Sequence, residues 1–285
     1  EEGERYRQSR VDDLRRALVA TGLVASAEVR VTPRADGRAV DLDVHLEPAP
    51  MRTVAGELGY GTGEGFRAEA SWQHRNFFNP EGALTVRGVL GTQEQLAAVS
   101  LRRSNFRARD QVLTVQASAG QVDRQAFEAR TLQLLGTLER QSNFIWQKSW
   151  TWSIGAELIA SDERDTIAAT GEERRRTFFI GALPASLVHD GTDDLLDPAT
   201  GFRLGGRISP ELSLQGSAFG YVRTQVDASA YRPVGERIVA AGRVRVGTIL
   251  GAERDRIAPS RRFYSGGGGS VRGYGYQQLG PRDAN

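Results

Sequence analysis

The sequence has 285 residues, enough for one large domain or for a large and a small one. Its 37 Lys and Arg side chains nearly balance 35 Asp and Glu side chains, so no strong basic field predicts nucleic-acid binding. The absence of cysteine excludes disulfides, thiolate metal sites and a thiol nucleophile.

Hydropathy excludes an ordinary transmembrane helix, because no window of about twenty apolar residues occurs. A transmembrane β-barrel needs no such window, since its apolar and polar residues alternate. The acidic start Glu1-Glu2-Gly3-Glu4 does not resemble a signal peptide. An exported protein that begins here is therefore expected to be a mature form or a piece of a longer chain.

The first fifty residues predict a small α+β unit. Ser9 resembles the first residue of a capping box, apolar residues follow it at helical spacing, and Gly22 supplies a stop. Alternating residues then predict two short antiparallel strands. The expected elements are a helix over about 10–21, strands over 27–32 and 40–46, and a turn at 35–37.

From Met51 onward the apolar residues recur with a period of two. Between Phe66 and Arg75, for example, the even positions up to Trp72 are apolar and the odd positions are polar. The pattern and the turn residues predict eleven strands, near 52–61, 65–75, 83–91, 95–103, 111–121, 126–140, 148–160, 174–190, 202–213, 218–232 and 237–250. A shift of the apolar phase between Phe127 and Leu132 predicts a β-bulge in the sixth strand.

This alternation fits either a soluble β-sandwich or a transmembrane barrel. The length of the segments and the mixture of arginine and glutamate on the polar face favour a barrel with a hydrated lumen. Long hydrophilic connections at 161–173 and after Gly251 are expected on the same outer side. The tryptophans fall toward strand ends, as in the aromatic girdles of such barrels: Trp72, Trp146, Trp150 and Trp152. Because single-chain barrels close with an even number of strands, an odd count of eleven predicts a truncated barrel.

A glycine-rich string follows the last predicted strand. Residues 263–283 read FYSGGGGSVRGYGYQQLGPRD and resemble the conserved loop-6 motif of the Omp85 superfamily. Their position after the eleventh strand is that of the sixth external loop, and residues 75–82 and 190–201 resemble two turns of the family. The motif residues are Gly266, Gly267, Ser270, Val271, Arg272, Gly273 and Tyr274.

The resemblance implies a transmembrane antiparallel β-barrel of the sixteen-stranded Omp85 type. Residues 51–285 would supply strands one to eleven and loop 6, without the last five strands. Residues 1–50 would be the C-terminal part of a periplasmic POTRA domain. The implied location is the outer membrane of a Gram-negative-type bacterium, with the POTRA part in the periplasm.

Within the superfamily, the strings 259–267 and 270–281 are most similar to the TamA branch, the barrel subunit of the translocation and assembly module. BamA-type insertases and two-partner-secretion exporters share the core motif and remain alternatives. The TamA resemblance implies a non-enzymatic factor that inserts or translocates β-barrel proteins, without a cofactor. The implied partners are client outer-membrane proteins and autotransporters, a TamB-like periplasm-spanning protein and outer-membrane lipid, but no nucleic acid.

In the family, loop 6 folds into the lumen and its arginine engages the inner wall. Glycines 266–269 let the backbone turn freely, and Arg272 offers five donors suited to a carboxylate, which we expect on the missing strands. The alternative is a flexible, solvated surface loop. Glu157 and the lumen arginines are expected to form a hydrated inner wall.

The first barrel strand contains three glycines in nine residues, so it should pair weakly with the closing strand. In the family, the first and last strands form a lateral gate, where a client strand can add by β-augmentation. The alternative is that these glycines accommodate tight curvature. The residues of this predicted seam are Val54, Gly56, Leu58, Gly59, Tyr60 and Gly61.

Catalytic and metal sites receive little support. His189-Asp190 invites a catalytic interpretation, but no serine is placed to complete a triad. His45, His74 and His189 share no metal-ligand spacing. We expect no catalytic, cofactor-binding or metal-binding residue.

Overall fold

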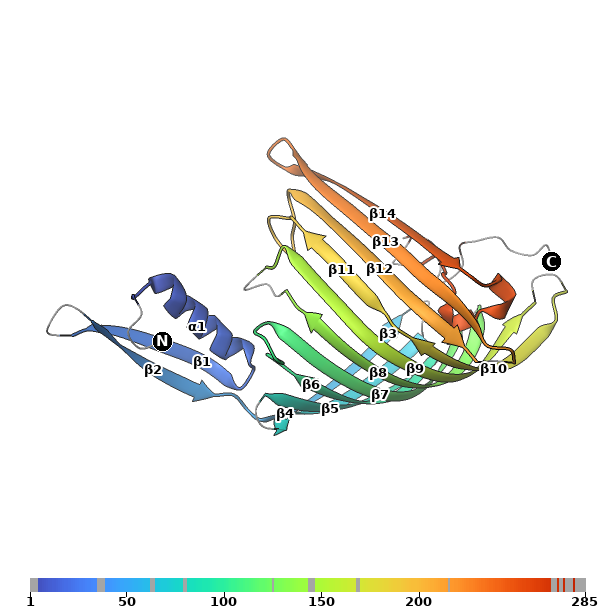
Figure 1. The fold of residues 1–285 in the computed structure, drawn as a ribbon, viewed down its shortest axis with the longest axis horizontal. Helices are drawn as coiled ribbons and strands as arrows, with labels where there is room; N and C mark the ends of the chain where they lie inside the picture. The colour runs from blue at the N-terminus through green and yellow to red at the C-terminus, as the bar shows by residue number, and fades with distance from the viewer. Residues whose placement is uncertain are drawn as a thin grey trace.

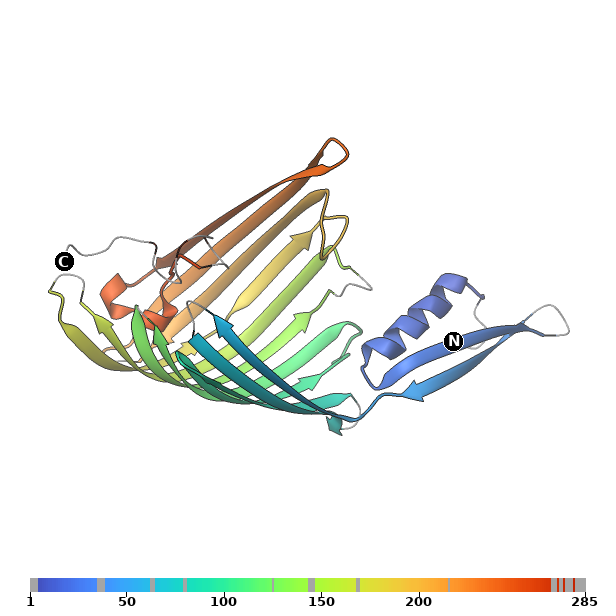
Figure 2. The same ribbon diagram turned by 180° about the vertical axis from the view of Figure 1, so that it is seen from behind.

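A curved antiparallel sheet and a small N-terminal module make up the chain (Figures 1 and 2). The structure is a computed structural model, and it describes residues 5–34, 39–61, 65–78, 81–124, 126–142, 147–167, 170–214, 216–267, 271, 274 and 279. No helix within these residues has the length and hydropathy to cross a membrane.

The N-terminal module consists of α1 (Gln8–Ala20), β1 (Val24–Pro33) and β2 (Val40–Pro48), with the two strands paired antiparallel. The predicted capping box is wrong: Arg7 is the N-cap and makes no side-chain cap bond, so Ser9 lies inside the first turn. Gly22 ends the helix as predicted, with a φ of 72°. The predicted turn at 35–37 lies outside the described residues.

The large sheet contains twelve strands: β3 (Arg52–Gly61), β4 (Gly65–Phe78), β5 (Gly82–Gly91), β6 (Glu94–Arg103), β7 (Gln111–Arg124), β8 (Phe127–Arg140), β9 (Trp150–Thr166), β10 (Glu173–Ala182), β11 (Ala185–Asp190), β12 (Gly201–Ser213), β13 (Phe219–Val234) and β14 (Ile238–Leu250). All the pairs are antiparallel. Consecutive strands pair with each other except β10 and β11, each of which pairs with both β9 and β12. Eleven strand positions therefore lie side by side, as the pattern predicts.

One predicted strand, 174–190, is interrupted. β10 ends at Ala182 and β11 begins at Ala185, because Pro184 has no N–H to donate to the ladder. The Pro184 carbonyl still accepts a hydrogen bond from the Gly155 N–H, 2.8 Å away. The predicted hydrophilic connection at 161–173 is also shorter, because β9 continues to Thr166.

The predicted bulge in the sixth barrel strand is wrong. β8 pairs without a register shift with both β7 and β9. Phe127 lies on the inward face, where its ring centroid is 5.7 Å from that of Tyr264, a residue that follows β14. The apolar phase shifts because this long-range contact places an aromatic ring on the otherwise polar face.

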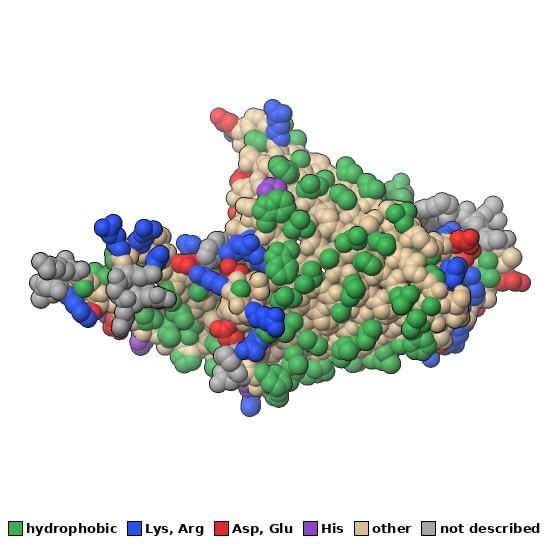
Figure 3. Space-filling view, in the orientation of Figure 1, with side chains coloured by type: hydrophobic (Ala, Val, Ile, Leu, Met, Phe, Trp, Pro, Cys, Tyr) green, Lys and Arg blue, Asp and Glu red, His purple; other side chains and the backbone are tan. Residues whose placement is uncertain are grey.

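The two faces of the sheet have opposite character. Apolar side chains such as Leu58 (86% exposed) and Leu132 (62% exposed) point outward, while Glu157, Glu163 and Glu211 point inward and are buried. Figure 3 shows hydrophobic side chains spread over the outward face, with charged side chains gathered toward its two ends. This arrangement confirms the predicted alternation and suits a lipid-facing wall rather than a water-exposed one.

The two ends of the sheet differ. At the end beside α1, called the near end, Arg109 in the β6–β7 turn donates to Asp13 of α1 over 2.5 and 2.8 Å. Trp72 and Trp150 lie toward this end, and Trp146 lies outside the described residues. At the opposite, far end, the chain leaves β14. β3 and β14 form the two edges of the described sheet and are not paired with each other.

Candidate functional site

The chain after β14 folds back onto the inward face of the sheet near the far end (Figure 2). This docked segment, residues 251–267, contains two short 3-10 turns, η1 (Arg254–Arg256) and η2 (Pro259–Arg261). Ile257, Ala258 and Pro259 are buried. Ala258 joins a small apolar cluster on the wall with Ile159, Phe178 and Ile180. The centre of the segment, residues 257–259, is therefore packed against the wall, while residues 253–256 are exposed.

Arg261 is the central contact of the docked segment. Its guanidinium donates to Glu157 over 3.0 Å and to Glu211 over 2.6 and 3.0 Å. Glu157 also accepts from Gln133, and Glu211 pairs with Arg223 at 3.3 Å. Both carboxylates are buried, so removing Arg261 would leave Glu157 without an ion pair among the described residues and Glu211 with Arg223 alone, and an uncompensated buried charge typically costs about 3–5 kcal/mol.

A second carboxylate of β9 holds the backbone of the same turn. Glu163 is 1% exposed and accepts hydrogen bonds from the Ser260 N–H (2.8 Å) and the Ser260 hydroxyl (2.6 Å). The Ser161 hydroxyl donates to it as well, over 2.7 Å. A buried carboxylate needs such donors, and here two of the three come from the docked segment.

A third carboxylate, Asp165, gathers arginines from two elements. Arg174 of β10 lies 3.0 Å from it, and Arg262 of the docked segment also lies 3.0 Å away. Arg262 additionally donates to the Ile257 carbonyl, and Arg176 donates to the Asp255 carbonyl. Arg262 and Arg176 thus tie both 3-10 turns to the wall.

Aromatic rings complete the packing. The half-buried Tyr264 ring lies against Phe127, and its hydroxyl donates to the Pro259 carbonyl over 3.0 Å. Burial raises the pKa of Tyr264, so the phenol stays neutral. Phe263 sits over Gly247 of β14, where a Cβ would lie 3.0 Å from its ring.

The structure describes part of the predicted loop-6 motif. Gly266 and Gly267 have φ values of 112° and 87°, which glycine adopts readily. The Gly267 N–H donates to the Tyr274 carbonyl over 3.0 Å, and Val271 bridges to Gly267. Ser270, Arg272 and Gly273 lie outside the described residues, so the contact of Arg272 with the wall stays a prediction.

Sequence reasoning missed the residues that hold the docked segment. Glu157 is buried against Arg261, whereas a hydrated wall was expected. The available signal was the acidic residues of β9, because positions 157, 163 and 165 share one parity and therefore one face. Their arginine partners lie in the string that precedes the glycines.

The predicted seam residues all lie on β3, which pairs with β4 alone among the described strands. Val54, Leu58 and Tyr60 point outward and are exposed. A Cβ at Gly59 would meet no atom within 4 Å, and one at Gly56 would meet only the Glu69 carbonyl at 3.8 Å. Close packing at a curved wall therefore does not require these two glycines.

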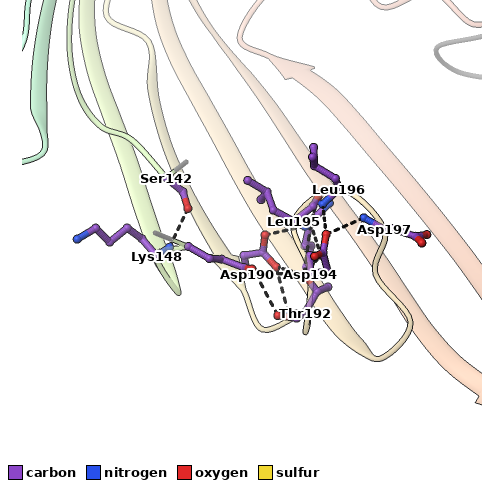
Figure 4. Close-up of polar contacts among 10 residues, drawn as sticks. Ser142, Lys148, Asp190, Thr192, Asp194, Leu195, Leu196 and Asp197 are labelled. Carbon is purple, nitrogen blue, oxygen red and sulfur yellow. Dashed lines mark hydrogen bonds and ion pairs between the residues drawn. The ribbon is translucent and has the colours of Figure 1, made fainter. Parts of the chain in front are cut away.

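The β11–β12 turn at the near end is held by carboxylates (Figure 4). Asp190 accepts from the Thr192 N–H and hydroxyl, and Asp194 accepts from the Leu196 and Asp197 N–H groups over 2.7 and 2.9 Å. Arg203 donates to Asp190 over 2.7 Å.

The structure does not bring the side chains of His189 and Asp190 together. Consecutive strand residues point to opposite faces. His189 lies between the rings of Trp150 and Phe202, with centroids 4.7 and 5.3 Å away. Asp190 is occupied by the turn.

Known proteins share this architecture. The BamA structure from Haemophilus ducreyi lacking POTRA domains 1–3 superposes with a TM-score of 0.73 at 19% identity, covering 99% of this chain and 57% of that one. CdiB from Acinetobacter baumannii gives a TM-score of 0.53 at 16% identity, covering 96% and 52%. At these identities the likeness shows the fold.

Sequence comparison gives the family. The outer membrane protein assembly factor BamA of Nitratidesulfovibrio vulgaris is 22% identical over 293 residues, covering 99% of this chain and 36% of the relative. The chain thus spans little more than a third of that relative's length. The Omp85 superfamily domain matches residues 60–285, most of the sequence and nearly all of the large sheet. The chain therefore belongs to the Omp85 superfamily.

Proposed function

We propose that this chain is part of an outer-membrane protein assembly factor that inserts or translocates β-barrel proteins, autotransporters among them. The observation that carries the proposal is the contrast between β3, a glycine-containing edge with outward apolar side chains, and a wall that the docked segment fixes from inside. Such a sheet can open at its edge without losing its inner packing.

The edge gives a mechanism for insertion. In lipid, each unpaired backbone N–H or C=O costs several kcal/mol, so an edge strand recruits a partner strongly. A client strand that pairs with β3 satisfies those groups through main-chain hydrogen bonds, which depend little on client sequence. Outward residues such as Leu58 extend the apolar surface toward lipid, so the client leaves sideways into the bilayer.

The docked segment supports this lateral route. Its contacts with Glu157, Glu163 and Glu211 place folded chain against the inward face, which narrows an axial path at the far end. In the full protein, we propose that loop 6 occupies the lumen of a sixteen-stranded barrel. Residues 1–50 would form the C-terminal part of a periplasmic POTRA domain.

Two branches of assembly factor remain to be separated. The string 259–267 supports a TamA-type factor that acts with a TamB-like periplasm-spanning partner, whereas the relatedness to BamA supports a general insertase. The test is depletion of the full-length protein followed by quantification of assembled outer-membrane proteins. Loss of autotransporter assembly alone, with a TamB-like protein recovered on the full-length bait, supports the TamA type. Loss of most barrel proteins supports the BamA type, and undiminished assembly of every client contradicts the proposal.

A two-partner-secretion exporter is the alternative, and the likeness to CdiB gives it some support. An exporter predicts large, stable conductance in planar bilayers and loss of one dedicated secreted substrate on depletion. An assembly factor with an occupied lumen predicts little conductance. Replacing Arg261 by alanine should raise conductance in the assembly factor, and a wild-type protein that conducts strongly would favour the exporter.

A further inference from the structure

A hollow of about 650 Å³ lies on the outward face across β7 to β12, away from the docked segment. Two neighbouring rows of outward residues form it. One row runs through Ala117, Leu134, Leu158, Gly181 and Leu212, and the next row toward the far end contains Leu132, Ala160 and Phe179. The hollow belongs to the apolar band rather than to the lumen.

Small residues create the hollow. Ala160 lies between Leu132 and Phe179, and Gly181 lies between Leu158 and Leu212. A Cβ at Gly181 would meet only the Leu158 side chain, at 3.9 Å, so no neighbouring group fills the space. The larger leucine and phenylalanine side chains form its walls. A groove of this shape suits a flexible hydrocarbon chain, which can follow irregular apolar surface.

Charged residues begin one step beyond the hollow toward the far end. Successive outward residues of a strand are about 7 Å apart. The next outward position after Leu132 is Arg130, and those beyond Ala160 are Asp162 and Arg164. On β10, Arg175 lies opposite Arg164. The apolar band therefore ends in a rim of guanidinium groups interspersed with carboxylates such as Asp162.

Two of the rim arginines form ion pairs, and the third, Arg130, lies opposite Asp162 in the ladder. Arg164 lies 2.9 Å from Glu128, and Arg175 lies 2.6 Å from Asp162. Arg130 is exposed and makes no ion pair with a described residue. Guanidinium groups bind phosphate through paired N–H donors. Arg175 donates from Nε and Nη2 to Asp162, so Arg130 and the Nη1 of the exposed Arg175 offer donors to a phosphate whose hydrocarbon chain lies in the hollow.

We propose that this hollow and its rim bind one phosphorylated lipid A molecule, with an acyl chain over Ala160 and Gly181 and a phosphate at Arg130 and Arg175. The inference rests on the proposed outer-membrane placement, in which the far end of the sheet faces the cell exterior and the rim lies in the outer leaflet. Phosphorylated lipid A is the main lipid of that leaflet. Charge complementarity at the rim and apolar contact below it select the same orientation of the lipid.

The test is retention of lipid by the full-length protein in detergent, measured by native mass spectrometry after incubation with lipid A or with phosphatidylglycerol. We expect the wild type to keep one lipid A and much less phosphatidylglycerol. Gly181→Leu fills the hollow and Arg130→Gln removes the rim cation that makes no ion pair with a described residue, so each should reduce lipid A retention about tenfold. Lipid A without phosphates should be retained as weakly by the wild type as by Arg130→Gln.

Matched controls use the same substitutions elsewhere on the outward face. Gly206→Leu places a leucine where a Cβ meets no atom within 4 Å, and Arg232→Gln removes an exposed arginine at the near end. Both should retain lipid A like the wild type, and heat-modifiable gel mobility confirms that each variant is folded. Equal retention of both lipids by the wild type, no retention of either, or equal loss in Gly181→Leu and Gly206→Leu would overturn the site.

The lipid site and the proposed function can be disproved independently of each other. Client assembly is measured in cells, whereas lipid retention is measured on purified protein. A protein that keeps lipid A in this way but assembles no client would overturn the proposed function and support the site.

Discussion

The β9–β12 wall and the β3 edge belong to one sheet and follow the same alternation of apolar and polar residues. They differ in their partners: the docked segment packs on the wall, whereas one side of β3 is unpaired in the described sheet. On the wall, inward carboxylates such as Glu163 are buried because the docked segment supplies their donors. On β3, the outward side chains are exposed and one row of backbone groups has no strand partner in the described sheet. Alternation therefore assigns faces, while long-range partners decide which part of the sheet is held and which part is left to open.

Removing the ion pairs between the docked segment and the β9–β12 wall should give the largest loss of stability. Arg261→Ala removes the donor shared by Glu157 and Glu211 and should lower the free energy of unfolding by about 3–5 kcal/mol, because buried Glu157 loses its ion pair and buried Glu211 keeps only Arg223. Urea unfolding of the full-length protein in micelles measures this change. Arg254→Ala, in the same segment but exposed and without an ion pair to a described residue, is the control and should have little effect.

The same pair of variants reports on docking itself. The sequence contains no cysteine, so Ala258→Cys introduces a single thiol at a position that is 1% exposed while the segment is docked. We expect this thiol to react with a maleimide faster in the Arg261→Ala background than in the Arg254→Ala background. Equal reactivity and equal unfolding in both backgrounds would show that the ion pairs do not hold the segment.

Much of the wall could be predicted from sequence, because period-2 alternation is a local property. The eleven strand positions and the outward face of residues such as Phe66 and Leu132 follow from it. Local errors came from chemistry that alternation ignores. Pro184 interrupts a predicted strand, and the N-cap of α1 is Arg7 instead of the predicted Ser9.

The docked segment could not be predicted in the same way. Arg261 meets Glu157 across 104 positions and Glu211 across 50, and no local period encodes such pairs. Phe127 gave a visible signal, an apolar residue in the polar phase, but its cause lay in Tyr264, far along the chain. The family motif contains Arg272, whereas the arginine that the described structure places on the wall is Arg261, which lies before the glycines.

Stabilising the β3 edge should give a smaller change in stability. Gly56→Val gives β3 a β-branched residue at a position where a Cβ has space, so the edge should gain about 0.5–1 kcal/mol in local stability. A stiffer seam should slow client insertion, measured as folding of a radiolabelled barrel protein in proteoliposomes. Gly88→Val is the control, because Gly88 faces the same Ala70 from the interior strand β5. Equal slowing by both variants would remove β3 from the mechanism.

We expect the smallest effect at the β11–β12 turn of the near end, which belongs neither to the docked segment nor to the β3 edge. This turn should stay ordered at neutral pH and lose order in acid. Backbone N–H groups of Asp197 and Leu196 hold the pKa of Asp194 below its usual value. A carboxyl with a lowered folded pKa stabilises above its unfolded pKa, and that stabilisation is lost as pH falls through the folded value. Hydrogen exchange of residues 191–200, corrected for intrinsic rates, should therefore show protection at neutral pH that falls below about pH 4. Asp194→Asn should flatten this dependence, whereas Asp197→Asn, which keeps its donating N–H, should preserve it; a flat profile in the wild type would show that the charge of Asp194 does not order the turn.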